Sequence, residues 1–280
     1  PSRVMMVAAG VNVILDPLLI FGIGPFPRLE LTGAAIATLI SYSMTLLFGM
    51  WVLVHREKML SFTIPRLEEI WHSWRSLFKL AIPAATTNMM APLTIGILTH
   101  VAASYGDSAV AALGVGTRIE SLAMIGVMAL SSVLVPFIGQ NWGAKKYDRV
   151  TDSIQFAIKF ALLWGVVICL LLAVSAPVIS RLFSDNAEVI QLTQTFLWII
   201  PISYTGMGLM VIASATYNAF HQPKVAAALV FTRLFILMVP MALTGAYFWQ
   251  VEGIFVGVMV ANIMAGGLAY IRLKRKVSSF

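Results

Sequence analysis

Eight apolar segments, each long enough to cross a lipid bilayer, fill most of this 280-residue chain. They cover residues 4–21, 33–54, 80–103, 112–137, 155–178, 190–213, 225–248 and 253–271. At ~1.5 Å of rise per residue, a helix of about 20 residues crosses a ~30 Å hydrocarbon layer. Hydrophobic residues make up 59% of the chain and the mean hydropathy is +0.89, which excludes a soluble globular protein. The sequence therefore predicts an all-α integral membrane protein with about eight transmembrane helices.

The basic residues indicate how these spans are oriented. Of the 19 Lys and Arg residues, 14 lie on one side of an alternating eight-span arrangement. They are Arg3, Arg56, Lys58, Arg66, Arg75, Lys79, Lys145, Lys146, Arg149, Lys224, Arg272, Lys274, Arg275 and Lys276. Because cytoplasmic loops carry the excess of Lys and Arg, we expect a multi-pass protein of the cell's inner (plasma) membrane with both ends of this chain cytoplasmic. The net charge of +7 then reflects topology and not nucleic-acid binding.

An internal repeat suggests two bundles. Residues 33–56 align without gaps on residues 253–276, and each segment begins with glycine and ends in basic residues. Six spans separate the equivalent helices, so we expect two bundles of six, with four helices upstream of this chain. The expected organisation has three parts: 1–55, the last two helices of an amino-terminal bundle; 56–79, a cytoplasmic amphipathic linker; and 80–280, a six-helix carboxy-terminal bundle.

Three motifs resemble a known transporter family. Asn12-Val-Ile-Leu-Asp16-Pro-Leu-Leu-Ile-Phe-Gly22 looks like the fifth helix of the multidrug and toxic compound extrusion (MATE) transporters. The segment Ala109–Glu120, followed by Gly139-Gln-Asn-Trp-Gly-Ala144, is similar to that family's eighth helix and its cytoplasmic exit. The resemblance covers helices five to twelve. It implies two bundles around a central cleft and secondary active efflux of organic, often cationic, compounds by proton or sodium antiport.

Asp16 is the acidic residue best placed to carry a coupling ion. It lies roughly 18 Å into its span by helix rise, where an unpaired carboxylate costs about 3 kcal/mol. Asn12 is one turn away on the same face and can hydrogen-bond the carboxyl group. The resemblance implies that Asn12, Asp16 and Thr38 form a site for a proton or for Na⁺. The alternative is that Asp16 caps a helix broken at Pro17.

Glu120 is the other acidic residue well inside a span. It either lines a cavity of the carboxy-terminal bundle and attracts cations, or pairs with a basic residue of a neighbouring helix such as Arg233. Further cavity or substrate candidates are polar residues of the expected seventh and tenth helices: Asn88, Tyr204, Tyr217 and Asn218. Some family members carry acidic residues on these two helices, and this chain has none there. That difference favours Asp16 as the coupling residue.

Other kinds of function find little support. The four histidines are scattered without metal-ligand spacing, and no Walker motif or nucleophile elbow is present. We therefore expect no enzyme activity, no cofactor and no metal site beyond Na⁺ at Asp16. The expected partners are small-molecule drugs or metabolites and membrane lipids, and the expected state is a monomer. The alternatives are a lipid-linked oligosaccharide flippase of the same superfamily, a fragment that does not transport, and an intramembrane transferase.

Two glycine pairs have the spacing of helix-packing motifs. They are Gly253/Gly257 and Gly139/Gly143. Close helix packing or a tight helix exit explains them better than a phosphate-binding loop does.

Overall fold

The computed structural model of the protein describes residues 2–59 and 66–278. Within these two ranges the secondary structure is helical, without a strand, so the predicted all-α class is confirmed. The chain divides into two units, Pro1–Arg75 and Ser76–Phe280, and each is described by itself.

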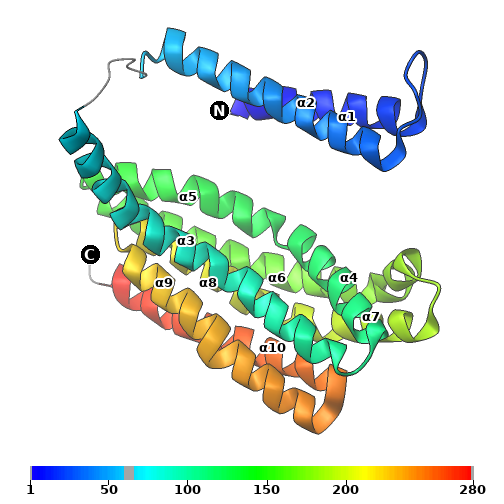
Figure 1. The fold of residues 1–280 in the computed structure, drawn as a ribbon. Coiled ribbons are helices and arrows are strands. Elements are labelled where there is room, and N and C mark those ends of the chain that lie inside the picture. Colours follow the sequence, from blue (N-terminus) through cyan, green and yellow to red (C-terminus); the bar gives the residue numbers. More distant parts are fainter. Residues whose placement is uncertain (1, 60–65, 279–280) are drawn as a thin grey trace. The chain divides into compact units, whose positions relative to one another are not determined.

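The first unit contains a helical hairpin. Helix α1 (Ser2–Phe21) packs against α2 (Glu30–Trp51), which continues into the π-helical turn η1 (Val52–Arg56) (Figure 1). A Cβ atom on Gly33 would lie 2.5 Å from the carbonyl oxygen of Leu19, so only glycine allows this approach of the two helices. Helix α1 runs through Pro17 to Phe21. The alternative that Asp16 caps a helix broken at Pro17 is therefore wrong.

The second unit is a bundle of longer helices. Its elements are α3 (Leu67–Ala103), which begins in the first unit, α4 (Asp107–Ala123), α5 (Ile125–Gly143), α6 (Tyr147–Phe183), α7 (Ala187–Ile199), η2 (Ile200–Ser203), α8 (Tyr204–Ala219), α9 (Pro223–Phe231), η3 (Thr232–Met238) and α10 (Val239–Val277). Residues Trp249 and Gln250 have non-helical backbone angles, so α10 consists of two helices joined at a sharp kink. The predicted spans 225–248 and 253–271 lie on either side of this kink.

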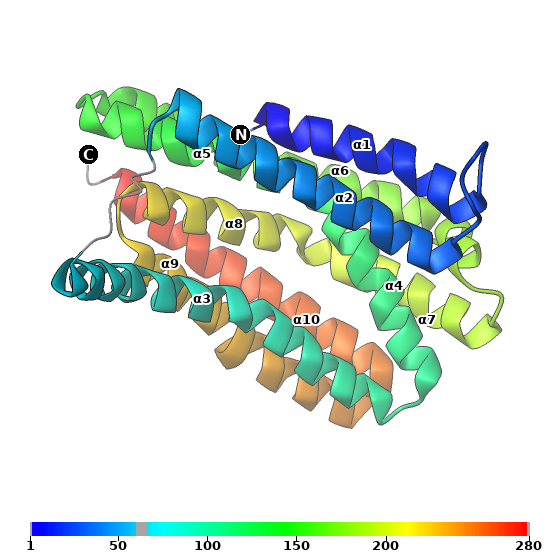
Figure 2. The same ribbon diagram turned by 45° about the horizontal axis from the view of Figure 1, so that its top comes forward.

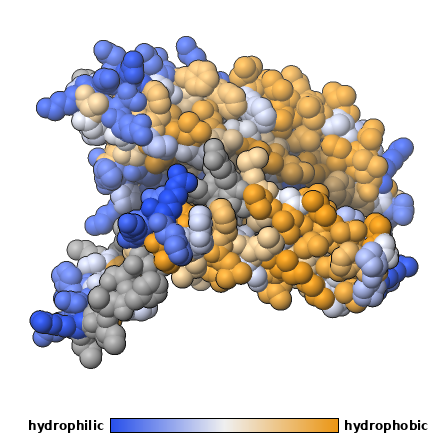
Figure 3. Space-filling model, turned by 90° about the horizontal axis from the view of Figure 1, so that it is seen from above, coloured by the Kyte–Doolittle hydropathy of each residue, from blue (hydrophilic) through white to orange (hydrophobic). Residues whose placement is uncertain are grey.

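Most of the predicted membrane passes coincide with described helices, but the predicted span 112–137 crosses the boundary between α4 and α5 at Met124. Five segments are long and apolar enough to cross a membrane: Glu30–Arg56, Ile125–Gly143, Tyr147–Phe183, Ala187–Ala219 and Pro223–Val277. The last contains the kink of α10 and so makes two passes, and Met6–Phe21 and Asn88–Ala103 are shorter apolar helices. Hydrophobic side chains cover most of the length of the helices in view, and hydrophilic side chains gather near the helix ends (Figure 3). This pattern is that of a multi-pass membrane protein.

Helix α8 lies at the centre of the second unit. It contacts α5, α6, α9 and α10 (Figure 2). Of the apolar stretch within Ala187–Ala219, 67% is buried, whereas 17% of the corresponding stretch of α6 is buried. Helix α8 is therefore surrounded by protein, and α6 offers most of its surface to lipid. A Cβ atom on Gly206 would lie 2.5 Å from the carbonyl oxygen of Asn262, which shows how closely α8 and α10 approach.

The two glycine pairs differ in their surroundings. Gly253 lies against the backbone of Gly245, and Gly257 lies against the carbonyl group of Met241, across the kink of α10. A Cβ atom on Gly139 or Gly143 would meet no atom of residues 2–59 or 66–278 within 4 Å, apart from those of its own helix turn. Close helix packing is therefore the role of the first pair only.

Candidate functional site

The first unit holds the Asn12–Asp16 pair on α1. The amide nitrogen Nδ2 of Asn12 donates a hydrogen bond to Oδ1 of Asp16 at 3.4 Å, and both side chains are half-buried. Thr38 on α2 donates its hydroxyl group to the carbonyl oxygen of Ala34 at 2.9 Å. No hydrogen bond joins Thr38 to Asp16 in the described part of the chain. The structure thus brings Asn12 and Asp16 together and gives Thr38 a contact within its own helix.

The second unit encloses a cavity of about 300 Å³ that contains two opposite charges. Glu120 reaches it from α4 and Arg233 from η3, and they are the charged residues of a mostly apolar lining. Arg118, two positions from Glu120, is exposed and lies on another face of α4. No ion pair within 4.0 Å joins Glu120 to Arg233 among the described residues, but each charge lies within the electrostatic field of the other. The cavity is therefore a mostly apolar pocket that holds one acidic and one basic side chain at membrane depth.

A chain of hydrogen bonds holds Arg233 in place. Its Nε donates to Oδ1 of Asn262 on α10 at 2.9 Å, and Nδ2 of Asn262 donates to the hydroxyl of Ser203 at 3.3 Å. Ser203 in turn donates to the carbonyl oxygen of Ile200 at 2.7 Å. Arg233 itself belongs to the π-helical turn η3, and such turns often mark functional sites within helices. The guanidinium is thus positioned by elements from three parts of the bundle.

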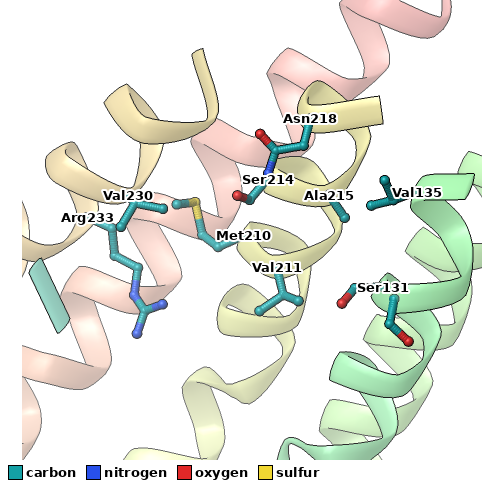
Figure 4. Close-up of a pocket in the computed structure, with 10 residues that line it drawn as sticks. Ser131, Val135, Met210, Val211, Ser214, Ala215, Asn218, Val230 and Arg233 are labelled. Atoms are coloured by element: carbon teal, nitrogen blue, oxygen red, sulfur yellow. The ribbon is translucent and has the colours of Figure 1, made fainter. Parts of the chain in front are cut away.

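A groove of about 330 Å³ with both polar and apolar lining residues runs along α8 beside this cavity (Figure 4). Helix α8 lies between α5 on one side and the α9–η3 segment on the other. The lining residues are Ser131, Ser132, Val135, Met210, Val211, Ser214, Ala215, Asn218, Val230 and Arg233. Arg233 is the charged member of this lining and also lines the buried cavity. A guanidinium at membrane depth is costly against lipid, so this face suits an aqueous cleft or a protein neighbour.

The remaining sequence candidates are dispersed. Asn88 is exposed on α3, and Tyr204 is buried with a hydroxyl group that has no hydrogen-bond partner among the residues described by the structure. Tyr217 donates its hydroxyl to the carbonyl oxygen of Arg272 at 3.2 Å, near the end of the bundle. Of the predicted residues of this unit, the structure places Glu120 in the cavity and Asn218 in the groove.

Sequence reasoning missed several polar residues of this site. They are Ser131, Ser132, Ser214 and Asn262. The signal was available, because each is a polar residue inside a strongly apolar segment, where polar groups usually face protein or a cavity. Between residues 2 and 59 and between 66 and 278, no three His, Cys, Asp or Glu side chains lie close enough together to hold a metal ion.

These features define a polytopic helical membrane protein with polar sites inside its helix bundle. Residues 83–244 match the MatE family, and the chain belongs to this family of transporters, which are not enzymes. It is 38% identical over 98% of its length to a FAD transporter of Shewanella oneidensis, and 27% identical over 86% of its length to the multidrug export protein MepA of Staphylococcus haemolyticus. The resemblance to MATE transporters is thereby confirmed.

Solved structures give the same result. The MATE transporter VcmN of Vibrio cholerae, in its bent form, is 32% identical and superposes on the whole chain with a TM-score of 0.81. The match covers 62% of that structure. The chain likewise spans 61% of the FAD transporter and 54% of MepA.

Proposed function

We propose that the protein containing this chain is a secondary active exporter that exchanges organic compounds for protons or Na⁺ across the inner membrane. The observation that carries the proposal is the Asn12–Asp16 hydrogen bond at membrane depth in a MatE-family chain. A carboxyl group inside a transmembrane helix is energetically costly, so its presence there indicates a function. Ion coupling is a common one. The amide of Asn12 stabilises the carboxylate and leaves its second oxygen available to an ion.

The proposed mechanism couples the two units of the chain. Loading of Asp16 with a proton or Na⁺ changes the relative stability of the inward-open and outward-open states. The groove along α8 forms part of the wall that the substrate contacts. The ion and the substrate each bind the two states with different affinity. The ion gradient can therefore drive export through reciprocal coupling between the two sites.

A specific observation favours a second class of substrate beside organic cations. Arg233 is the charged residue that lines the groove in the described part of the chain, and its guanidinium can bind an anionic or phosphate-bearing compound. A relative with 38% identity is named a FAD transporter. Flavin dinucleotide export is therefore the second candidate, beside export of amphipathic cations.

Gradient-driven export from proteoliposomes tests the proposal. The full-length protein is reconstituted, and export of a cationic dye and of flavin adenine dinucleotide is measured with and without an imposed proton or Na⁺ gradient. Asp16→Asn keeps the shape and hydrogen bonding of the side chain but removes its charge. Because coupling free energies are typically about 1–3 kcal/mol, we expect this variant to lower gradient-driven export by about 5–150-fold.

Glu120→Gln is the matched control, since it neutralises the other membrane-depth carboxylate of the described residues. We expect it to retain most of the export. Full activity in Asp16→Asn together with loss in Glu120→Gln would move the coupling site to the second unit. Absence of export for both compounds in the wild-type protein would contradict the proposal.

A further inference from the structure

A basic groove lies at one end of the second unit, where α8 and α9 meet the last turns of α10. Its volume is about 450 Å³. The residues that line it are Tyr217, Gln222, Val225, Arg272, Arg275 and Lys276. The positive-inside pattern assigns this end of the bundle to the cytoplasm.

The three basic residues point to the same place because of their spacing. Arg272, Arg275 and Lys276 are at positions i, i+3 and i+4 of α10, which is one face of a helix. Lys274 belongs to the same basic run but does not line the groove. Membrane topology and the negative end of the helix dipole explain why basic residues occur here. Neither effect explains why three of the four basic residues in this run line the same groove.

Neighbouring residues hold the groove in shape and place it at the membrane surface. The hydroxyl of Tyr217 donates to the backbone carbonyl of Arg272 at 3.2 Å, which ties α10 to α8. The ammonium group of Lys276 lies 5.1 Å from the ring centroid of Phe220 and 5.9 Å from that of Trp142. Aromatic rings beside basic residues are typical of the level of the lipid headgroups.

The chemistry of the lining is that of an anion site. Among the residues that the structure describes, no carboxylate lines this groove. Both arginines are exposed, and neither guanidinium makes a hydrogen bond or ion pair with another side chain in the described part of the chain. Two guanidinium groups offer planar forks of N–H donors that match the oxygens of a phosphate.

We propose that this groove binds the phosphate headgroup of an anionic phospholipid from the cytoplasmic leaflet. The groove is open rather than enclosed, and it lies where the helices leave the hydrocarbon layer, so the acyl chains can remain in the bilayer while the phosphate contacts Arg272 and Arg275. Basic pockets between transmembrane helices on this side of a membrane are known to take such headgroups. The proposal does not depend on which compound the protein exports.

Native mass spectrometry of the full-length protein in detergent tests this site. The probes are phosphatidylglycerol, phosphatidylcholine and soluble glycerol 3-phosphate. The test variant is the double substitution Arg272→Gln and Arg275→Gln, and the matched control is Lys274→Gln, which removes an equivalent charge from the same turn. A basic residue near an anionic membrane surface changes affinity by roughly fivefold, so we expect the double variant to bind phosphatidylglycerol roughly 25-fold more weakly.

The control should bind phosphatidylglycerol as the wild-type protein does, and phosphatidylcholine should bind weakly to all three proteins. Thermal unfolding without added lipid shows whether the variants are folded, which we expect because the bond from Tyr217 goes to the backbone of Arg272. Weakening by Lys274→Gln of roughly fivefold, in proportion to the one charge that it removes, would show that only net charge matters and would overturn the site. Equal affinity for glycerol 3-phosphate would identify a site for soluble phosphates instead.

Discussion

At the scale of single residues, the most informative side chains are the charged ones at membrane depth. Glu120 and Arg233 line one cavity, and Asn262 receives the hydrogen bond of Arg233. Removing one member of a buried pair of charges leaves the other uncompensated, which costs more than the pair itself contributes. We therefore expect each of these two charged side chains to affect the stability of the protein mainly through its interaction with the other.

A double-mutant cycle on Glu120 and Arg233 tests this pairing. We expect Arg233→Gln alone to lower the midpoint of thermal unfolding in detergent, since it leaves Glu120 without its counter-charge. Adding Glu120→Gln should restore part of the loss, with a coupling free energy of about 0.5–3 kcal/mol. The control is Arg118→Gln, an exposed position on another face of α4, combined with Glu120→Gln. Strictly additive effects in the first cycle would show that Glu120 is not paired with Arg233.

At the scale of helices, glycine decides how closely elements pack. Gly253 and Gly245 face each other across the kink of α10. Gly206 of α8 lies against the backbone of Asn262 in α10. Without a hydrophobic driving force between helices in lipid, such backbone contacts supply much of the packing. The kink and the glycines together allow the two halves of α10 to form adjacent membrane passes.

The packing role of Gly253 is measurable by substitution. We expect Gly253→Ala to destabilise the protein by about 1–3 kcal/mol, because the added methyl group forces the backbone at Gly245 away. The measurement is the thermal unfolding midpoint in detergent. Gly139→Ala is the matched control: it adds the same methyl group within a helix where nothing lies within 4 Å, and it should change the midpoint little. Because alanine favours a helix more than glycine does, an equal loss in both variants would show that the contact with Gly245 is not its cause.

At the scale of the whole molecule, the sequence predicts helices that alternate across the membrane, with the basic residues on one side. Arg28 and Arg181 fall on the other side of the predicted arrangement, together with the turn at residues 104–107. This orientation follows from the distribution of Lys and Arg in short loops.

Cysteine labelling in cells tests the orientation. In a background in which Cys169 is replaced by alanine, single cysteines at positions 28, 107 and 185 should react with an impermeant thiol reagent added outside. Cysteines at positions 58, 146 and 276 should react only after the membrane is permeabilised. The predicted orientation rests on loop charge alone. Labelling of position 146 in intact cells would show that the orientation is the opposite one. Retained export by each variant ensures that the labelled protein is folded.

Composition and periodicity were enough to predict the class of the protein and its membrane passes. A run of 20 apolar residues has few options other than a transmembrane helix, because backbone groups in lipid must be paired within the chain. The i, i+4 spacing likewise predicted the contact of Asn12 with Asp16, which the structure shows.

Other features depended on contacts between distant segments. The sequence placed Asn88, Tyr204, Tyr217 and Asn218 together as cavity candidates, whereas the structure distributes them over an exposed face, the core, one end of the bundle and the groove. Which face of a helix meets a neighbour depends on crossing angles and on kinks such as that of α10. The sequence of one segment determines that it is a helix in the membrane. Only the tertiary structure decides which polar side chains share a cavity, because that requires several helices to pack against one another at once.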